Sequence, residues 1–236
     1  MRTALVAAAL AVAGCTHPVL LKKYVATAPK QAGIEGRALY VAPFTDRRVD
    51  EWSDDKSVPL PEPKGFARRE LTGEQADAWE DERDALEVSL PKEQWHRVGT
   101  KRNGFGMPIQ DVHSVTPPAD WLTQAARLSL EAQGAKLSGS PGDADLVVEA
   151  VLRHAWLDLY VATWVHLVLD VTTTPRGGQP KTVRIHASEG MTAWTGDSRE
   201  SYEIFSATEQ RLERYLVEHV AKQLAAQPVT STPLPP

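Results

Sequence analysis

Apolar and polar side chains alternate with a period of two from Ala144 to Thr174, and this pattern restricts the fold more than any other feature of the chain. One face of the first half collects Leu146, Val148, Ala150, Leu152, His154 and Trp156, and one face of the second half collects Val161, Thr163, Val165, Leu167, Leu169 and Val171. A period of two is typical of a strand with one buried face. The segment therefore predicts two half-buried strands that form a hairpin turning near residues 158–160.

Shorter patterns predict the elements around this hairpin. A β-rich run over residues 38–44, broken at Pro43, predicts a first strand, and a short strand is expected over residues 135–137. Residues 182–194 predict a third strand of the hairpin sheet, with Val183, Ile185 and Ala187 facing inward. Residues 201–225 predict the last helix, whose apolar stripe consists of Phe205, Leu212, Leu216, Val220 and Leu224.

Residues 117–133 predict another helix, since Thr116 can cap it, prolines occupy its first turn and Gly134 follows its end. Its expected packing face consists of Trp121, Ala125, Leu128 and Ala132. Two capped helices disfavour an all-β fold. The order of the elements predicts an α+β fold, with a mostly antiparallel sheet, the two main helices packed on one face, and a long charged insertion after the first strand.

The insertion covers residues 44–112 and holds 11 Lys and Arg with 16 of the 31 Asp and Glu residues of the chain. We expect one short helix in it, near residues 69–86, and a tight turn near residues 102–108 with positive φ at Gly104 and Gly106. Two interpretations are open: a solvated surface excursion, or a partner-binding loop in which Trp52, Trp79 and Trp95 act as anchors.

The first fourteen residues predict a secretory signal peptide, because Arg2 precedes an uncharged run that ends in small residues. The alternative, a buried N-terminal helix, would show polar residues with a period of 3.6. Such a run is also too short to remain as a membrane-spanning helix.

Val12, Ala13 and Gly14 followed by Cys15 resemble the lipobox of bacterial lipoproteins. The resemblance implies recognition of the three residues by the signal peptidase and lipid attachment to Cys15. Acyl chains on this cysteine would hold the protein on a membrane, at about 0.8 kcal/mol for each buried CH₂. Thr16, which is not Asp, implies delivery to the bacterial outer membrane, with the domain facing the periplasm.

The composition of the remaining segments predicts how the chain is divided. Residues 15–36 are expected to be the lipidated cysteine and a tether, residues 37–226 a single domain, and residues 227–236 a disordered Pro-rich tail. One cysteine excludes an intramolecular disulfide, and a net charge of −5 disfavours nucleic acid as a partner.

Catalytic and metal-binding patterns are weak. The predicted strands place His154 on the inner face and His166 on the outer face, whereas zinc requires its ligands around one point. We therefore expect no metal and no cofactor. The sequence has no G-x-S-x-G motif, and the acidic residues of 77–87 suit a solvated face better than an acid–base pair.

Residues 42–48 (APFTDRR), the string Asn103-Gly104-Phe105-Gly106, and a Pro-led helix ending at Gly134 resemble the YajG-type family of uncharacterised bacterial outer-membrane lipoproteins. The resemblance implies a periplasm-facing accessory domain without known catalytic residues. The charges of Asp46, Arg47 and Arg48 either pin the strand end to the sheet or form an exposed ligand-binding cluster.

The sequence thus predicts a non-enzymatic, membrane-anchored lipoprotein that binds an envelope protein or lipid. Its binding surface is expected in the insertion or on the outer sheet face near Trp164, His166 and Trp194. Two alternatives stay open: an auxiliary lipoprotein of a lipid or envelope transport system, and an envelope hydrolase.

Overall fold

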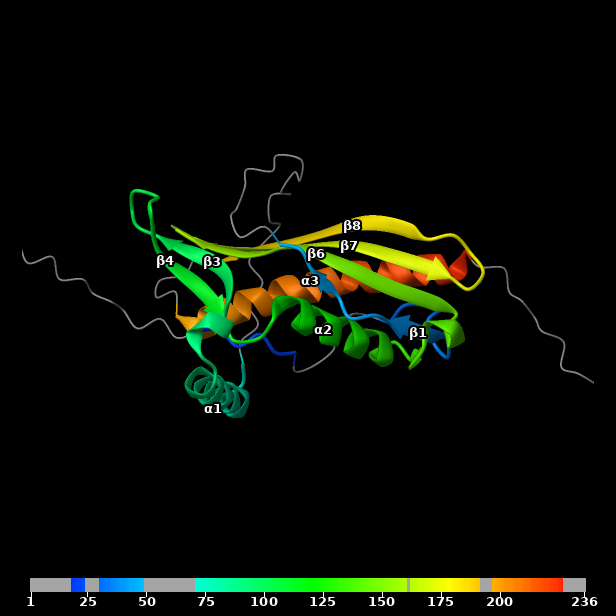
Figure 1. Ribbon diagram of the computed structural model, residues 1–236, viewed down its shortest axis with the longest axis horizontal. Helices are drawn as coiled ribbons and strands as arrows, with labels where there is room; N and C mark the ends of the chain where they lie inside the picture. Colours follow the sequence, from blue (N-terminus) through cyan, green and yellow to red (C-terminus); the bar gives the residue numbers. More distant parts are fainter. Residues whose placement is uncertain (1–17, 24–29, 49–70, 161, 192–196, 227–236) are drawn as a thin grey trace, which may run out of the picture.

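Strand β6 (Leu146–Leu159) is the centre of the sheet, because neighbours pair along both of its edges. The computed structural model (Figure 1) describes residues 18–23, 30–48, 71–160, 162–191 and 197–226. On one edge β6 pairs antiparallel with β7 (Thr163–Pro175), which pairs antiparallel with β8 (Lys181–Met191). These three long strands correspond to the period-two segment and the strand predicted after it.

Two separate groups of short strands share the other edge of β6. Its first half pairs in parallel with β1 (Ala38–Val41) and β2 (Thr45–Asp46), and β5 (Lys136–Leu137) pairs beyond β1. Its last residues pair in parallel with β3 (His96–Arg102), which forms an antiparallel hairpin with β4 (Pro108–Ser114). The longest pairings are antiparallel and the short ones are parallel.

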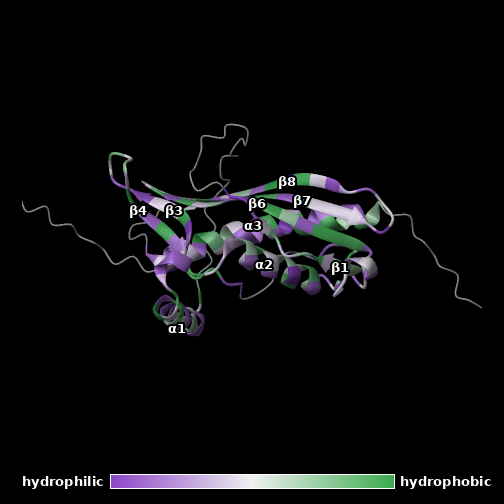
Figure 2. Ribbon diagram, viewed as in Figure 1, coloured by the Kyte–Doolittle hydropathy of each residue, from purple (hydrophilic) through white to green (hydrophobic). Residues whose placement is uncertain are grey.

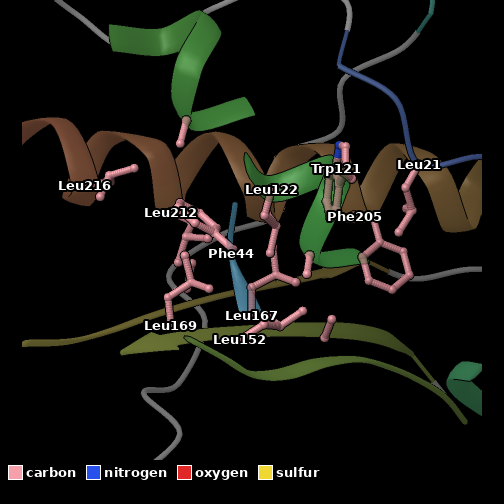
Figure 3. Close-up of a cluster of buried hydrophobic side chains, with 14 of the residues drawn as sticks. Leu21, Phe44, Trp121, Leu122, Leu152, Leu167, Leu169, Phe205, Leu212 and Leu216 are labelled. Atoms are coloured by element: carbon pink, nitrogen blue, oxygen red, sulfur yellow. The ribbon is translucent and has the colours of Figure 1, made fainter. Parts of the chain in front are cut away.

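Helices α2 (Pro118–Ala132) and α3 (Ser198–Ala225) lie on the same side of the sheet (Figure 1). Their apolar side chains pack against the inner face of the strands, as Figure 3 shows for Leu122, Phe205 and Leu212 above Leu152 and Leu167. Helix α1 (Gly73–Ser89) lies at one end of the molecule. The predicted α+β fold, with two main helices on one face, is confirmed.

The local details of α2 differ from those predicted. Its N-cap is Pro117, without a side-chain hydrogen bond, so the predicted cap by Thr116 is wrong. Gly134 follows the helix with φ of +88°, a conformation that glycine adopts readily, and the predicted stop is confirmed. The buried side is rotated from the predicted face, because Ala132 is exposed whereas Leu122, Ala126 and Leu130 are buried.

A β-bulge in β6 overturns the predicted face of two side chains. The register with β7 shifts between Leu152 and His154, which inserts one extra residue into β6. Ala155 and Leu157 therefore take the inner face, and both are buried in the core. His154 and Trp156 pair with Val168 and His166 on the outer face, so their predicted inward position is wrong.

Part of the predicted insertion belongs to the sheet. Besides α1, which the sequence predicted three to four residues early, residues 44–112 contain the β3–β4 hairpin. Gly99 allows β3 to approach β6, because a Cβ at this position would lie 2.2 Å from the carbonyl oxygen of Leu157. In the predicted turn Gly106 has φ of +80°, as expected, while Gly104 does not have a positive φ.

The prediction that residues 15–36 form a tether is wrong for several described residues before β1, because their side chains are buried. Val19, Leu20, Leu21 and Ile34 are core residues. The Lys23 ammonium is buried between two carboxylates of α3, 2.8 Å from Glu209 Oε1 and in contact with Glu213. The folded domain therefore includes these residues and does not begin near residue 37.

No described helix is both long and apolar enough to span a membrane.

Replacing Lys23 with Ala should lower the free energy of unfolding by about 3–5 kcal/mol, because it leaves Glu209 and Glu213 buried without a cation. Urea unfolding measures the change. Lys22→Ala is the matched control, since Lys22 pairs with Glu82 at the surface and its loss should cost less than about 1 kcal/mol. Equal losses in the two variants would show that residue 23 is outside the fold.

Candidate functional site

The tryptophans expected to contact a partner are not exposed anchors where the structure describes them. Trp79 is fully buried: its indole N–H donates to the Leu20 carbonyl at 2.9 Å, and its ring lies 5.3 Å from that of Tyr202. The prediction that Trp79 anchors a partner is therefore wrong. Trp95 is half-buried against the core, with the Lys92 ammonium 5.6 Å from its ring centre. Trp52 lies outside the described residues.

The charged residues after β1 hold two parts of the sheet together. The Arg48 guanidinium binds the Asp46 carboxylate and also donates to the Arg97 carbonyl at 2.9 Å, which links β2 to β3. The backbone N–H of Arg47 donates to the Leu152 carbonyl of β6. Of the two interpretations of this cluster, these bonds support the structural pin.

Three histidines share the outer face of the sheet, because the bulge turns His154 toward His166 and His186. The His166 and His186 rings are 5.7 Å apart. Val168 of β7 pairs with His154 on one side and with His186 on the other. Burial, and then the charges of His186 and His154, lower the pKa of His166 to about 4. No group of three or more His, Cys, Asp or Glu side chains in the described part of the chain is arranged to hold a metal.

The rest of the outer face is closely packed. The Trp164 ring lies against Gly190 of β8, where a Cβ would be only 2.0 Å from the ring. The Arg97 guanidinium lies 5.1 Å from the centre of the Trp156 ring, and both Trp156 and His166 are buried. Trp194, the third residue expected at this face, lies outside the described residues. Trp156 and His166 therefore offer little surface to a partner, whereas Trp164, His154 and His186 beside them are half-buried.

Replacing His166 with Phe should reduce the acid sensitivity of the fold. The unfolded side chain takes up its proton near pH 6.5 and the folded one near pH 4, so wild-type stability falls as the pH drops between these values. From pH 8 to pH 5 this imidazole accounts for about 2 kcal/mol of the loss in unfolding free energy. Burial raises the pKa of Glu189 and of Glu209, which acts in the opposite sense, but equally in both proteins.

Urea unfolding of both proteins at pH 8 and pH 5 measures the difference. Parallel pH dependences in the two proteins would contradict the assignment to His166.

Exposed apolar side chains gather instead at the loop between β3 and β4. Phe105 is 88% exposed, Met107 56% and Ile109 59%, and Tyr160 from the end of β6 lies beside them, with its hydroxyl donating to the Gly104 carbonyl at 3.1 Å. We call these four residues the apolar tip. Figure 2 shows the hydrophobic residues at the end of this hairpin, away from the core. Contiguous exposed apolar groups commonly mark an interaction site.

The backbone of the apolar tip is held in one conformation. Asn103 Oδ1 accepts hydrogen bonds from the N–H groups of Phe105 and Met107, both at 3.0 Å. The Arg102 guanidinium bridges the Asp158 carboxylate at 2.9 Å and the Gly106 carbonyl at 3.3 Å. A loop fixed in this way presents its side chains without a large loss of conformational entropy on binding.

Sequence reasoning missed the apolar tip, although its signal was visible. The Gly-rich string 102–108 predicts a turn and residues 103–106 carry the family resemblance, yet Phe105 and Met107 are also large apolar residues in a place where polar ones are usual. Phe105, Met107 and Ile109 lie inside the insertion predicted to bind a partner, whereas Tyr160 lies outside it, and none of the predicted tryptophans belongs to the tip.

No family model matches the chain, and no curated protein matches its sequence. Among solved structures, protein XCC0632 from Xanthomonas campestris, of the DUF330 family, has a TM-score of 0.51 at 11% identity, over 87% of this chain and 99% of that one. Lipoprotein GNA1162 from Neisseria meningitidis has a TM-score of 0.25 at 10% identity, over 81% and 99% of the two chains. A minor lipoprotein from Acinetobacter baumannii has a TM-score of 0.28 at 20% identity, over 47% and 87%.

The likeness to XCC0632 shows a shared fold and nothing further. The resemblance to the YajG-type family stays a prediction from the sequence.

Proposed function

We propose that the protein is a lipid-anchored lipoprotein of the bacterial outer membrane, whose α+β domain faces the periplasm and binds another envelope component through the apolar tip. The observation that carries the proposal is the exposure of Phe105 and Met107, on a loop whose backbone is hydrogen-bonded to Asn103, and of Ile109 at the start of β4. Burying three such side chains contributes about 1.5–3 kcal/mol each, which is enough for a specific contact.

Three carboxyl groups with shifted pKa values have cationic partners within the fold, which supports binding over catalysis. Asp170 is held by Arg153 and Arg184, both at 2.7 Å, and their hydrogen bonds lower its pKa. Glu189 forms an ion pair with Arg211, and Glu209 is paired with Lys23. These groups stabilise the sheet and α3 and are not directed at a substrate.

The anchor rests on the lipobox-like residues Val12, Ala13, Gly14 and Cys15. Cells grown with labelled palmitate should incorporate the label into the wild-type protein and not into Cys15→Ser, because the thiol is the point of lipid attachment. Thr16→Ser is the control, and this variant should incorporate label normally. An unlabelled wild-type protein would contradict the anchor.

A photoreactive benzoylphenylalanine at position 105 tests the contact. In intact cells, ultraviolet light should produce an adduct with an envelope component. The matched control places the same residue at Val88 in α1, which is apolar and 89% exposed, and should give no adduct. Absence of an adduct from position 105, or the same adduct from both positions, would overturn the proposed function.

A further inference from the structure

The chain enters the domain alongside strand β4. The Val19 N–H donates to the His113 carbonyl at 2.7 Å, and the Val115 N–H donates to the Val19 carbonyl at 3.0 Å. These two bonds form a parallel bridge between Val19 and Ser114. Leu20, Leu21 and Lys23 then continue into the core, so the entry point is fixed to the domain.

The described start of the chain runs in the same direction as β4, away from the apolar tip. Strand β4 starts at Pro108, next to the tip, and runs about 20 Å to Ser114, at 3.4 Å per residue. Because Val19 pairs in parallel there, Pro18 lies on the side of Val19 that faces the tip. Figure 1 shows the β3–β4 hairpin and α1 toward one end of the molecule, the described N-terminal segment between α1 and α2, and the last turn of α3 at the other end.

The distance from Cys15 to the fold is short. Four residue steps separate Cys15 from Val19, and an extended chain spans at most about 3.3–3.6 Å per step, or roughly 14 Å in all. Acyl chains on Cys15 would therefore hold the β4 end of the domain at the bilayer surface, without a long tether.

The distribution of charge favours the apolar tip over helix α1 as the part that contacts the lipid. Residues 101–110 contain Lys101 and Arg102 and no acidic residue, and because Arg102 is paired with Asp158, Lys101 is the basic side chain available to the lipid. Helix α1, at the same end, carries seven acidic residues and one arginine, and most of them are exposed. Anionic lipid headgroups attract basic side chains and repel acidic ones.

We propose that the envelope component bound by the apolar tip is the lipid bilayer that carries the anchor. Phe105, Met107 and Ile109 enter the boundary between headgroups and acyl chains, and Lys101 lies among the headgroup phosphates. The inference rests on the lipid anchor of the proposed function, and it makes the tip a second attachment point. Two attachments fix the orientation of the domain, whereas acyl chains alone leave it free to rotate.

The single cysteine of the chain gives a direct test. In the mature lipoprotein the Cys15 sulfur is acylated, so Phe105→Cys introduces one free thiol, which accepts an NBD fluorophore. The labelled full-length lipoprotein is reconstituted into vesicles of phosphatidylethanolamine and phosphatidylglycerol, with and without lipids that carry a nitroxide on the acyl chain. The label at position 105 should emit at shorter wavelength and be quenched severalfold more strongly by the nitroxide than a label at Val88→Cys.

Val88 is the matched control, because its exposure of 89% equals that of Phe105 within one per cent and it lies on the acidic helix. Met107→Cys is a second test position and should behave like position 105. Equal quenching at positions 88, 105 and 107 would overturn the inference.

The photoreactive residue at position 105 separates the two proposals. Lipid adducts support both of them. Protein adducts together with an unquenched label support the proposed function and overturn the bilayer as the bound component. No adduct of either kind overturns the proposed function itself.

Discussion

The buried ammonium of Lys23 connects the beginning of the described chain to the two helices that cover the sheet. It contacts Glu209 and Glu213 of α3, and Glu213 accepts a hydrogen bond from Ser129 of α2. Two buried carboxylates side by side repel each other, and the pKa of Glu209 is raised by burial and by Glu213. A cation between them is therefore a condition for packing α2 against α3. Lys23 of the N-terminal segment supplies this cation. Detaching the segment would therefore leave the carboxylates of Glu209 and Glu213 buried without a cation.

Local patterns predicted the main elements of this fold well. The period-two segment gave β6 and β7, and the Pro and Gly residues around residues 117–134 gave α2 within one residue at each end. The faces of β6 were predictable only as far as Leu152, because a bulge adds a residue and inverts the alternation after it. No glycine or proline near residues 152–154 marks the bulge, which is visible only in the register between β6 and β7.

The candidate site was less predictable than the fold, because exposure depends on contacts distant in sequence. Trp79 is expected at a binding surface by residue type, yet Leu20 and Tyr202 from opposite ends of the chain bury it. The residues before β1 look like a tether by composition, and only the Lys23 pairs and the bridge to Ser114 place them inside the domain. The apolar tip was open to detection, since its loop combines glycines with large apolar side chains.

The short link between Cys15 and Val19 restricts how far from the membrane other contacts of the domain can occur. With the tip end at the bilayer, the long axis of the molecule, which α3 follows in Figure 1, leads away from the membrane. A helix of 28 residues is about 42 Å long at 1.5 Å per residue. In this proposed orientation, the far ends of α3 and of the β7–β8 hairpin would stay at a set height above the bilayer. A periplasmic protein that binds this far end would do so at that height above the bilayer. A domain on a long, flexible tether would instead bind partners over a range of heights.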